Sequence, residues 1–75
     1  MPKLPRLSGA RLAAALMKLG FVKVRQRGSH LLLRRLRPEP TTHCVVPMHR
    51  ELATGTLHGV LKQSGITAEE LLSVL

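Results

Sequence analysis

One histidine lies at the centre of a run of positive charge in this 75-residue chain. The segment from Lys23 to Arg37 holds six of the twelve lysines and arginines, no acidic residue, and His30. Histidine is the usual side chain for proton transfer near neutral pH, because its ordinary pKa is about 6.5. Basic residues at this density attract a phosphate backbone. The combination predicts acid–base chemistry on a phosphodiester, and the competing interpretation is a set of ordinary solvated charges.

RNA offers a cleavage reaction for which one histidine can act without a metal. A base removes the proton of the 2′-hydroxyl, and the resulting oxygen attacks the adjacent phosphorus. The candidate base is His30, and Arg25, Arg27 or Arg34 could stabilise the charge that grows on phosphorus. The alternative is that His30 is an ordinary polar residue at the start of a strand. The four acids of the chain are not clustered in the way that metal-dependent nucleases need to hold magnesium. We therefore expect neither a metal nor a cofactor.

The other histidines and the single cysteine rank below His30 as functional candidates. His43 and Cys44 are neighbours in a predicted strand, so their side chains should point to opposite faces. The chain has no Cys-x-x-Cys or His-x-x-x-His spacing that would indicate a metal site, and His49 and His58 stand alone. One cysteine excludes an internal disulfide and fits a reducing compartment. We expect Cys44 to be a small buried residue.

Three helices are predicted, beginning at Ser8, around residue 57, and after Thr67. The Ser8 hydroxyl can cap the first helix, and glycines at 20 and 65 can end the first and second in a left-handed conformation. Thr67-Ala68-Glu69-Glu70 has the pattern of a capping box. Apolar residues spaced three and four apart mark the buried faces of the first two helices: Leu12, Leu16, Leu19, Leu57, Val60 and Leu61.

Three short strands are predicted between the first two helices, over residues 22–25, 30–35 and 41–46. Short loops between them favour an antiparallel meander, with the helices on one face of the sheet and the other face open. This is an α+β fold of the double-stranded-RNA-binding-domain type. We expect residues 1–75 to form a single domain, as is usual at this length.

The open face is expected to present the side chains that would meet RNA, namely Lys23, Arg25, His30 and Arg34. By the alternation of strand residues, Leu32 should lie on the same face. Arg27, Gly28 and Ser29 would add to the RNA-binding surface from the turn between the first two strands. Val22 and Val24 are expected to face the core. Because Phe21 is the only aromatic residue among Phe, Tyr and Trp, base stacking on exposed rings is poorly supported, which favours RNA with some structure.

The charge balance limits the class of partner. A net charge of +8, with every acid at Glu39 or later, points to a polyanion. No apolar run approaches the ~20 residues needed to cross a bilayer, so we expect no membrane partner. The N-terminal residues lack the pattern of a secretory signal, which favours a cytoplasmic protein. Two other functions stay open: a non-catalytic RNA-binding module, and an adaptor that binds an acidic protein.

A set of short motifs, in order along almost the whole chain, resembles the HicA toxin family. They are Gly20-Phe21, Arg25-Gln26-Arg27-Gly28-Ser29-His30, Val46-Pro47-Met48-His49, Gly55-Thr56-Leu57, Val60-Leu61-Lys62-Gln63-Ser64-Gly65-Ile66-Thr67 and Glu69-Glu70. The resemblance implies an mRNA interferase, the toxin of a type II toxin–antitoxin module, which arrests growth by cutting messages. It implies that His30 is the catalytic histidine and that Gly28 corresponds to the glycine of the family's motif, two residues before the histidine.

The resemblance also implies a partner, the antitoxin HicB, which covers the catalytic histidine. Leu32, if exposed beside His30, would be a contact for that antitoxin. The chain departs from the family pattern in having three leucines after His30, and in Arg50 where a glycine is common. The resemblance provides no second acid, so the proton donor to the leaving oxygen is unassigned.

Overall fold

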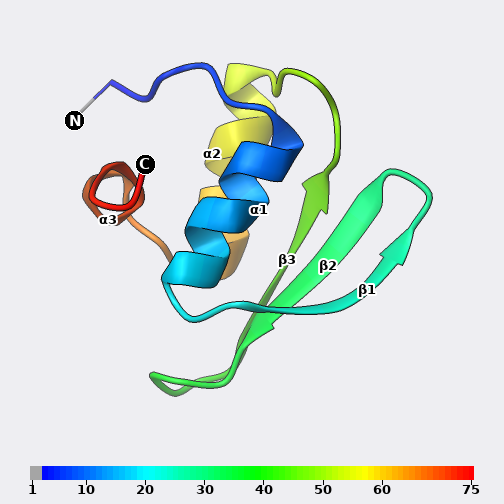
Figure 1. Cartoon of the computed structure of the whole chain (residues 1–75). Helices are drawn as coiled ribbons and strands as arrows, with labels where there is room; N and C mark the ends of the chain where they lie inside the picture. Colours follow the sequence, from blue (N-terminus) through cyan, green and yellow to red (C-terminus); the bar gives the residue numbers. More distant parts are fainter. Residues whose placement is uncertain (1–2) are drawn as a thin grey trace.

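The computed structural model describes residues 3–75 and contains an antiparallel sheet with helices on one of its faces (Figure 1). The elements in chain order are α1 (Gly9–Lys18), β1 (Val22–Arg27), β2 (His30–Arg35), β3 (Thr42–Pro47), α2 (Thr54–Ser64) and α3 (Ala68–Leu72). The strands lie in the order β1-β2-β3. The predicted α+β class and meander are confirmed, and the architecture is compatible with the double-stranded-RNA-binding type.

The start of α1, the end of α2 and the start of α3 lie where the sequence predicted, whereas α2 begins at Thr54, earlier than the predicted residue 57. The Ser8 hydroxyl accepts a hydrogen bond from the Arg11 N–H at 3.0 Å, and Gly65 ends α2 with a φ of 74°. At α3 the Glu70 N–H donates to the Thr67 hydroxyl at 3.1 Å, and the Thr67 N–H donates to the Glu70 carboxylate at 3.0 Å. This second bond lowers the pKa of Glu70, because it favours the charged carboxylate.

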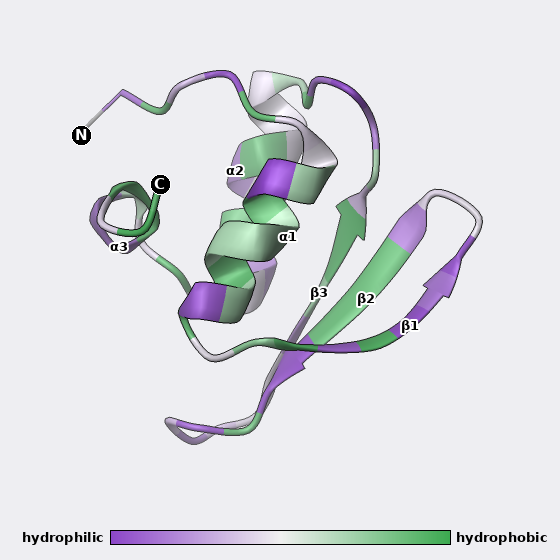
Figure 2. Cartoon of the chain, in the orientation of Figure 1, coloured by the Kyte–Doolittle hydropathy of each residue, from purple (hydrophilic) through white to green (hydrophobic). Residues whose placement is uncertain are grey.

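The core lies between the helices and the covered face of the sheet. The buried side chains come from all three helices, the α1–β1 junction, β2 and β3. Among the most buried are Leu12, Leu16, Phe21, Leu33, Val46 and Leu71. Figure 2 shows hydrophobic colour along the middle of β2 and β3, with hydrophilic colour along much of β1. Burial of these side chains is the main source of stability for the sheet that carries His30.

Arg35 closes one end of this core. Its guanidinium donates to the Leu19 carbonyl at 3.2 Å and lies over the Phe21 ring, 4.9 Å from the ring centre. Both contacts stabilise the end of α1, since cations favour helix C-termini and aromatic faces. One of the six basic residues in the central run is therefore part of the structure.

The expectation that Val22 and Val24 face the core is wrong. Both are exposed, at 52% and 42% of their surface. A bulge interrupts the pairing of β1 with β2 between Lys23 and Arg25, so Val24 is the extra residue and the alternation is broken there. In addition, β1 is an edge strand, and the helices pack mainly on β3 (Figure 1).

Cys44 is buried, as predicted, with 1% of its surface exposed. Burial raises the pKa of its thiol to about 11, because the charged thiolate would lose its hydration. We expect iodoacetamide to alkylate the folded protein at least ~10-fold more slowly than the unfolded protein, since the thiolate is the reactive form. Mass spectrometry after timed alkylation, with and without urea, measures the ratio. Equal rates would contradict the burial of Cys44.

Each helix described within residues 3–75 is too short or too polar to pass through a lipid bilayer.

Candidate active site

His30 is the first residue of β2 and its side chain is exposed. It pairs with Arg27 across the β1–β2 hairpin and with Pro47 on β3. Leu31 and Leu33 are buried on the covered face, so His30 points to the open face by the alternation of strand residues. This is the position that the sequence predicted.

The turn before His30 is fixed by hydrogen bonds at both sides. Gly28 has a φ of 58°, and with Ser29 it forms a two-residue loop in which glycine takes the first position, as in a type II′ turn. The Gln26 side-chain amide donates to the Gly28 carbonyl at 3.0 Å. The Met48 N–H donates to the Ser29 carbonyl at 2.6 Å. The turn is thus joined to the segment after β3, which limits the positions open to His30.

A hollow of about 230 Å³ lies on the open face beside His30. Its other lining residues are Arg25, Arg27, Leu32 and Val45. Leu32 pairs with Arg25 on one side and with Val45 on the other, so all three side chains share one face. We refer to these five residues as the His30 hollow. Val45 was not among the residues selected from the sequence, although the burial of both its neighbours is a signal that it points outward.

Two arginines give the His30 hollow its positive charge. Arg25 and Arg27 are both exposed. The ion pair found among residues 3–75 joins Arg6 to Glu51 at 3.3 Å, away from this face, so no carboxylate is paired with either arginine of the hollow. Two cations without a paired anion can attract and bind a phosphate group.

The structure separates Lys23 and Arg34 from this site. Lys23 pairs with the buried Leu33, so it lies on the covered side of the sheet, and the expectation that it shares a face with Arg25 is wrong. The bulge in β1 is the cause. Arg34 is on the open face, as expected, but four residues along β2 from His30, which is ~13 Å at the usual rise of a strand. His43 pairs with Arg34 at that far end.

The description "HicA toxin of bacterial toxin-antitoxin" belongs to a protein-family model that matches residues 9–66. The matched segment contains α1, the whole sheet and α2. This chain belongs to the HicA toxin family. It is accordingly the toxin of a toxin–antitoxin system, and its family is known for ribonuclease activity. No curated protein sequence has significant similarity to the chain.

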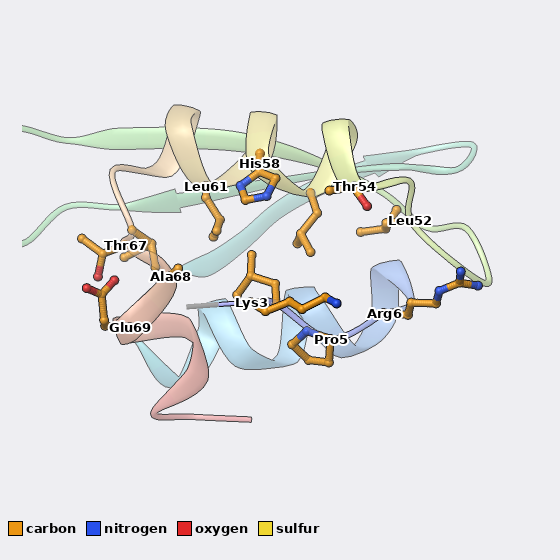
Figure 3. Close-up of a pocket in the computed structure, with 13 residues that line it drawn as sticks. Lys3, Pro5, Arg6, Leu52, Thr54, His58, Leu61, Thr67, Ala68 and Glu69 are labelled. Atoms are coloured by element: carbon orange, nitrogen blue, oxygen red, sulfur yellow. The ribbon is translucent and has the colours of Figure 1, made fainter. Parts of the chain in front are cut away.

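The HicA match includes every residue of the His30 hollow, whereas a larger cavity is only partly covered by it. That cavity, of about 550 Å³, lies between the N-terminal segment, α2 and the start of α3 (Figure 3). It includes Lys3 to Arg6 and Thr67 to Glu69, which lie outside residues 9–66. His58 is the histidine on its wall. We take the smaller hollow as the candidate active site, because it joins a histidine to two unpaired cations.

Proposed function

We propose that this HicA toxin is a metal-independent endoribonuclease that cuts mRNA with His30 as the general base. The observation that carries the proposal is the exposed imidazole of His30 in one hollow with the guanidinium groups of Arg25 and Arg27. A proton acceptor beside two phosphate-binding cations is the minimum needed for cleavage by the 2′-hydroxyl of RNA.

The proposed reaction is a single displacement at phosphorus. A ring nitrogen of His30 takes the proton of the 2′-hydroxyl, and the 2′-oxygen forms a bond to the adjacent phosphorus. The bond from phosphorus to the 5′-oxygen breaks, and that oxygen takes a proton from water, which reaches the exposed face. Arg25 and Arg27 stabilise the extra negative charge on the phosphoryl oxygens during the step. The products are a 2′,3′-cyclic phosphate and a 5′-hydroxyl.

Other residues of the open face extend the contact with RNA. We place Gly28 and Ser29 next to the phosphate that reacts, because they form the turn that precedes His30. Arg34 contacts the RNA strand at another nucleotide, since it is too distant from His30 to bind the same phosphate. Lys23, on the other side of the sheet, is not part of this contact.

The partner in this proposal is a HicB antitoxin, and the substrate is mRNA in the cytoplasm. An antitoxin that covers the open face would block the His30 hollow, and the half-buried Leu32 would provide an apolar contact at its centre. Release of the antitoxin would expose the site and arrest growth through the loss of messages.

The test is the end chemistry of the products in the absence of metal. We expect the purified chain, in EDTA, to cut an RNA oligonucleotide and leave 2′,3′-cyclic phosphate and 5′-hydroxyl ends, detected by mass spectrometry. The matched substrate is the same sequence with 2′-deoxyribose throughout, which should stay intact because it lacks the nucleophile. Cleavage that needs Mg²⁺, or that leaves 3′-hydroxyl ends, would contradict the mechanism. Binding of RNA with no cleavage would favour a non-catalytic RNA-binding module instead.

A further inference from the structure

The floor of the His30 hollow is apolar, which a site for phosphate alone does not require. Leu32 and Val45 are direct partners on neighbouring strands, and both point to the open face. Val45 keeps 39% of its surface exposed, and Leu32 is half-buried. Exposed apolar side chains enclosed by charged ones indicate a binding surface. Phosphate and ribose gain little from such a surface, but the flat face of a nucleobase does.

The size of the hollow suits a single base. Its volume of about 230 Å³ is below the roughly 300–1,000 Å³ of sites that hold drug-sized molecules. The cations Arg25 and Arg27 lie on the β1 side of Leu32, and His30 is the first residue of β2. A base on the floor therefore has its own sugar and phosphate close to both the imidazole and the guanidinium groups.

We propose that Leu32 and Val45 seat one unpaired nucleobase next to the phosphate that is cut, so that this toxin cleaves RNA at unpaired nucleotides and not within a duplex. The inference rests on the proposed ribonuclease function and names its substrate class. It makes Leu32 and Val45 specificity-determining residues, which position the nucleotide for His30.

The geometry of RNA explains why the base must be unpaired. In a duplex the faces of the bases are covered by stacking, and proteins reach only the edges and the backbone. A base face can contact Leu32 only after the base has left the stack, as in enzymes that extrude a nucleotide. The attacking 2′-oxygen must also lie opposite the leaving 5′-oxygen, which the stacked strand of an A-form helix does not allow. Movement of the nucleotide out of the stack both uncovers the face of its base and allows the 2′-oxygen to lie opposite the leaving oxygen.

Aliphatic side chains here take the place of the aromatic rings that single-strand binders use. The chain has no exposed aromatic residue on this face, since Phe21 is buried. An aliphatic floor contacts a base through dispersion and burial only. We therefore expect the toxin to recognise one unpaired nucleotide, in a loop or bulge of otherwise structured RNA. The arginines would contact the RNA backbone around it.

The experiment removes the base and keeps the reacting atoms. Starting from an RNA that the wild-type chain cuts at one bond, an abasic ribose replaces in turn each of the two nucleotides that flank that bond. We expect one of the two replacements to lower kcat/KM by ~10-fold or more, because the burial of apolar base surface on Leu32 and Val45 is lost. The same strand annealed to its complement should not be cut at that bond.

Leu32→Ala tests the residue. We expect it to lower kcat/KM on intact RNA by a similar factor and to respond little to removal of the base, because the contact is already lost. Val22→Ala is the matched control: it shortens an exposed valine on the same sheet that does not line the hollow, and it should keep the wild-type response. Circular dichroism checks the fold, and if Leu32→Ala does not fold, the wild-type comparison of intact, abasic and duplex RNA decides.

The outcomes separate this inference from the proposed function. Equal cleavage of intact and abasic RNA by the wild-type chain, or equal cleavage of single strand and duplex, would overturn the base-seating role and leave a ribonuclease. No cleavage of any RNA would overturn the proposed function itself. If Leu32→Ala weakens binding of a HicB protein but keeps the wild-type response to base removal, the floor serves the antitoxin and the inference is wrong.

Discussion

Replacement of His30 by alanine is expected to slow RNA cleavage by ~100- to 10,000-fold, the usual contribution of a general base. The imidazole is exposed on the open face and lies outside the core, so the variant should fold as the wild-type chain does. The rate is measured under single-turnover conditions with EDTA, and thermal unfolding is followed beside it. Binding of RNA should persist, because Arg25 and Arg27 are unchanged.

His43→Ala is the matched control for this substitution. His43 is also an exposed histidine on the open face, but it pairs with Arg34 at the far end of the sheet. We expect it to keep cleavage within a small factor of wild type. A similar loss in both variants would mean that the effect is one of charge or folding, and an unchanged rate in His30→Ala would remove the imidazole from the mechanism. In cells, expression of His30→Ala should no longer arrest growth.

Local sequence signals predicted most helix ends and the strands β2 and β3 well, for a physical reason. A cap or a helix-ending glycine acts within a few residues, so Ser8, Gly65 and Thr67 could be assigned without knowledge of the fold. Leu33 and Val46 lie on strands that face the helices, where alternation reports burial directly.

The same rule failed on β1, because its packing is decided by contacts distant in sequence. The valines there alternate with basic residues as in a half-buried strand, yet the bulge and the edge position leave both Val22 and Val24 exposed. The shift also moved Lys23 off the open face. The prediction that these residues form a strand was correct. The face to which each side chain points depends on the register of β1 with β2, which the local sequence does not determine.

Some residues of the candidate site could likewise be predicted from the local sequence, and one could not. His30, Arg25 and Arg27 could be selected from residue type and from the resemblance to HicA toxins, because they lie in one hairpin. Val45 joins them only through its pairing with Leu32 across β2 and β3, thirteen residues apart. Alternation along β3 contained the signal, but its functional meaning needed the register of the neighbouring strand.

Gly9 supports the site from the helix side, a role that no sequence pattern indicated. It is the first residue of α1, and its N–H donates to the His49 carbonyl at 2.9 Å. A side-chain carbon at this position would overlap the Pro47 carbonyl oxygen and come within 2.8 Å of the Met48 Cα. All of these are backbone atoms, so they cannot move aside as a flexible side chain would. The helix start and the segment after β3 thus pack in direct backbone contact.

Gly9→Ala is therefore expected to lower the free energy of unfolding by about 3 kcal/mol, the upper part of the range for overpacking. That is a large share of the stability of a chain this small. Urea unfolding followed by circular dichroism measures the change as a shift in midpoint. Cleavage should fall as well in the fraction that stays folded, because the Met48 N–H holds the Ser29 carbonyl and a displaced segment would move the turn before His30.

Gly59→Ala provides the control, since it makes the same chemical change inside α2 where a side-chain carbon meets no atom within 4 Å. It should stabilise the protein by up to ~1 kcal/mol, because alanine is the better helix former. Opposite signs for the two substitutions would locate the effect in the backbone contact of Gly9. If Gly9→Ala were as stable as wild type, α1 would have to stand further from the segment after β3, and the support that fixes His30 would come from the hairpin alone.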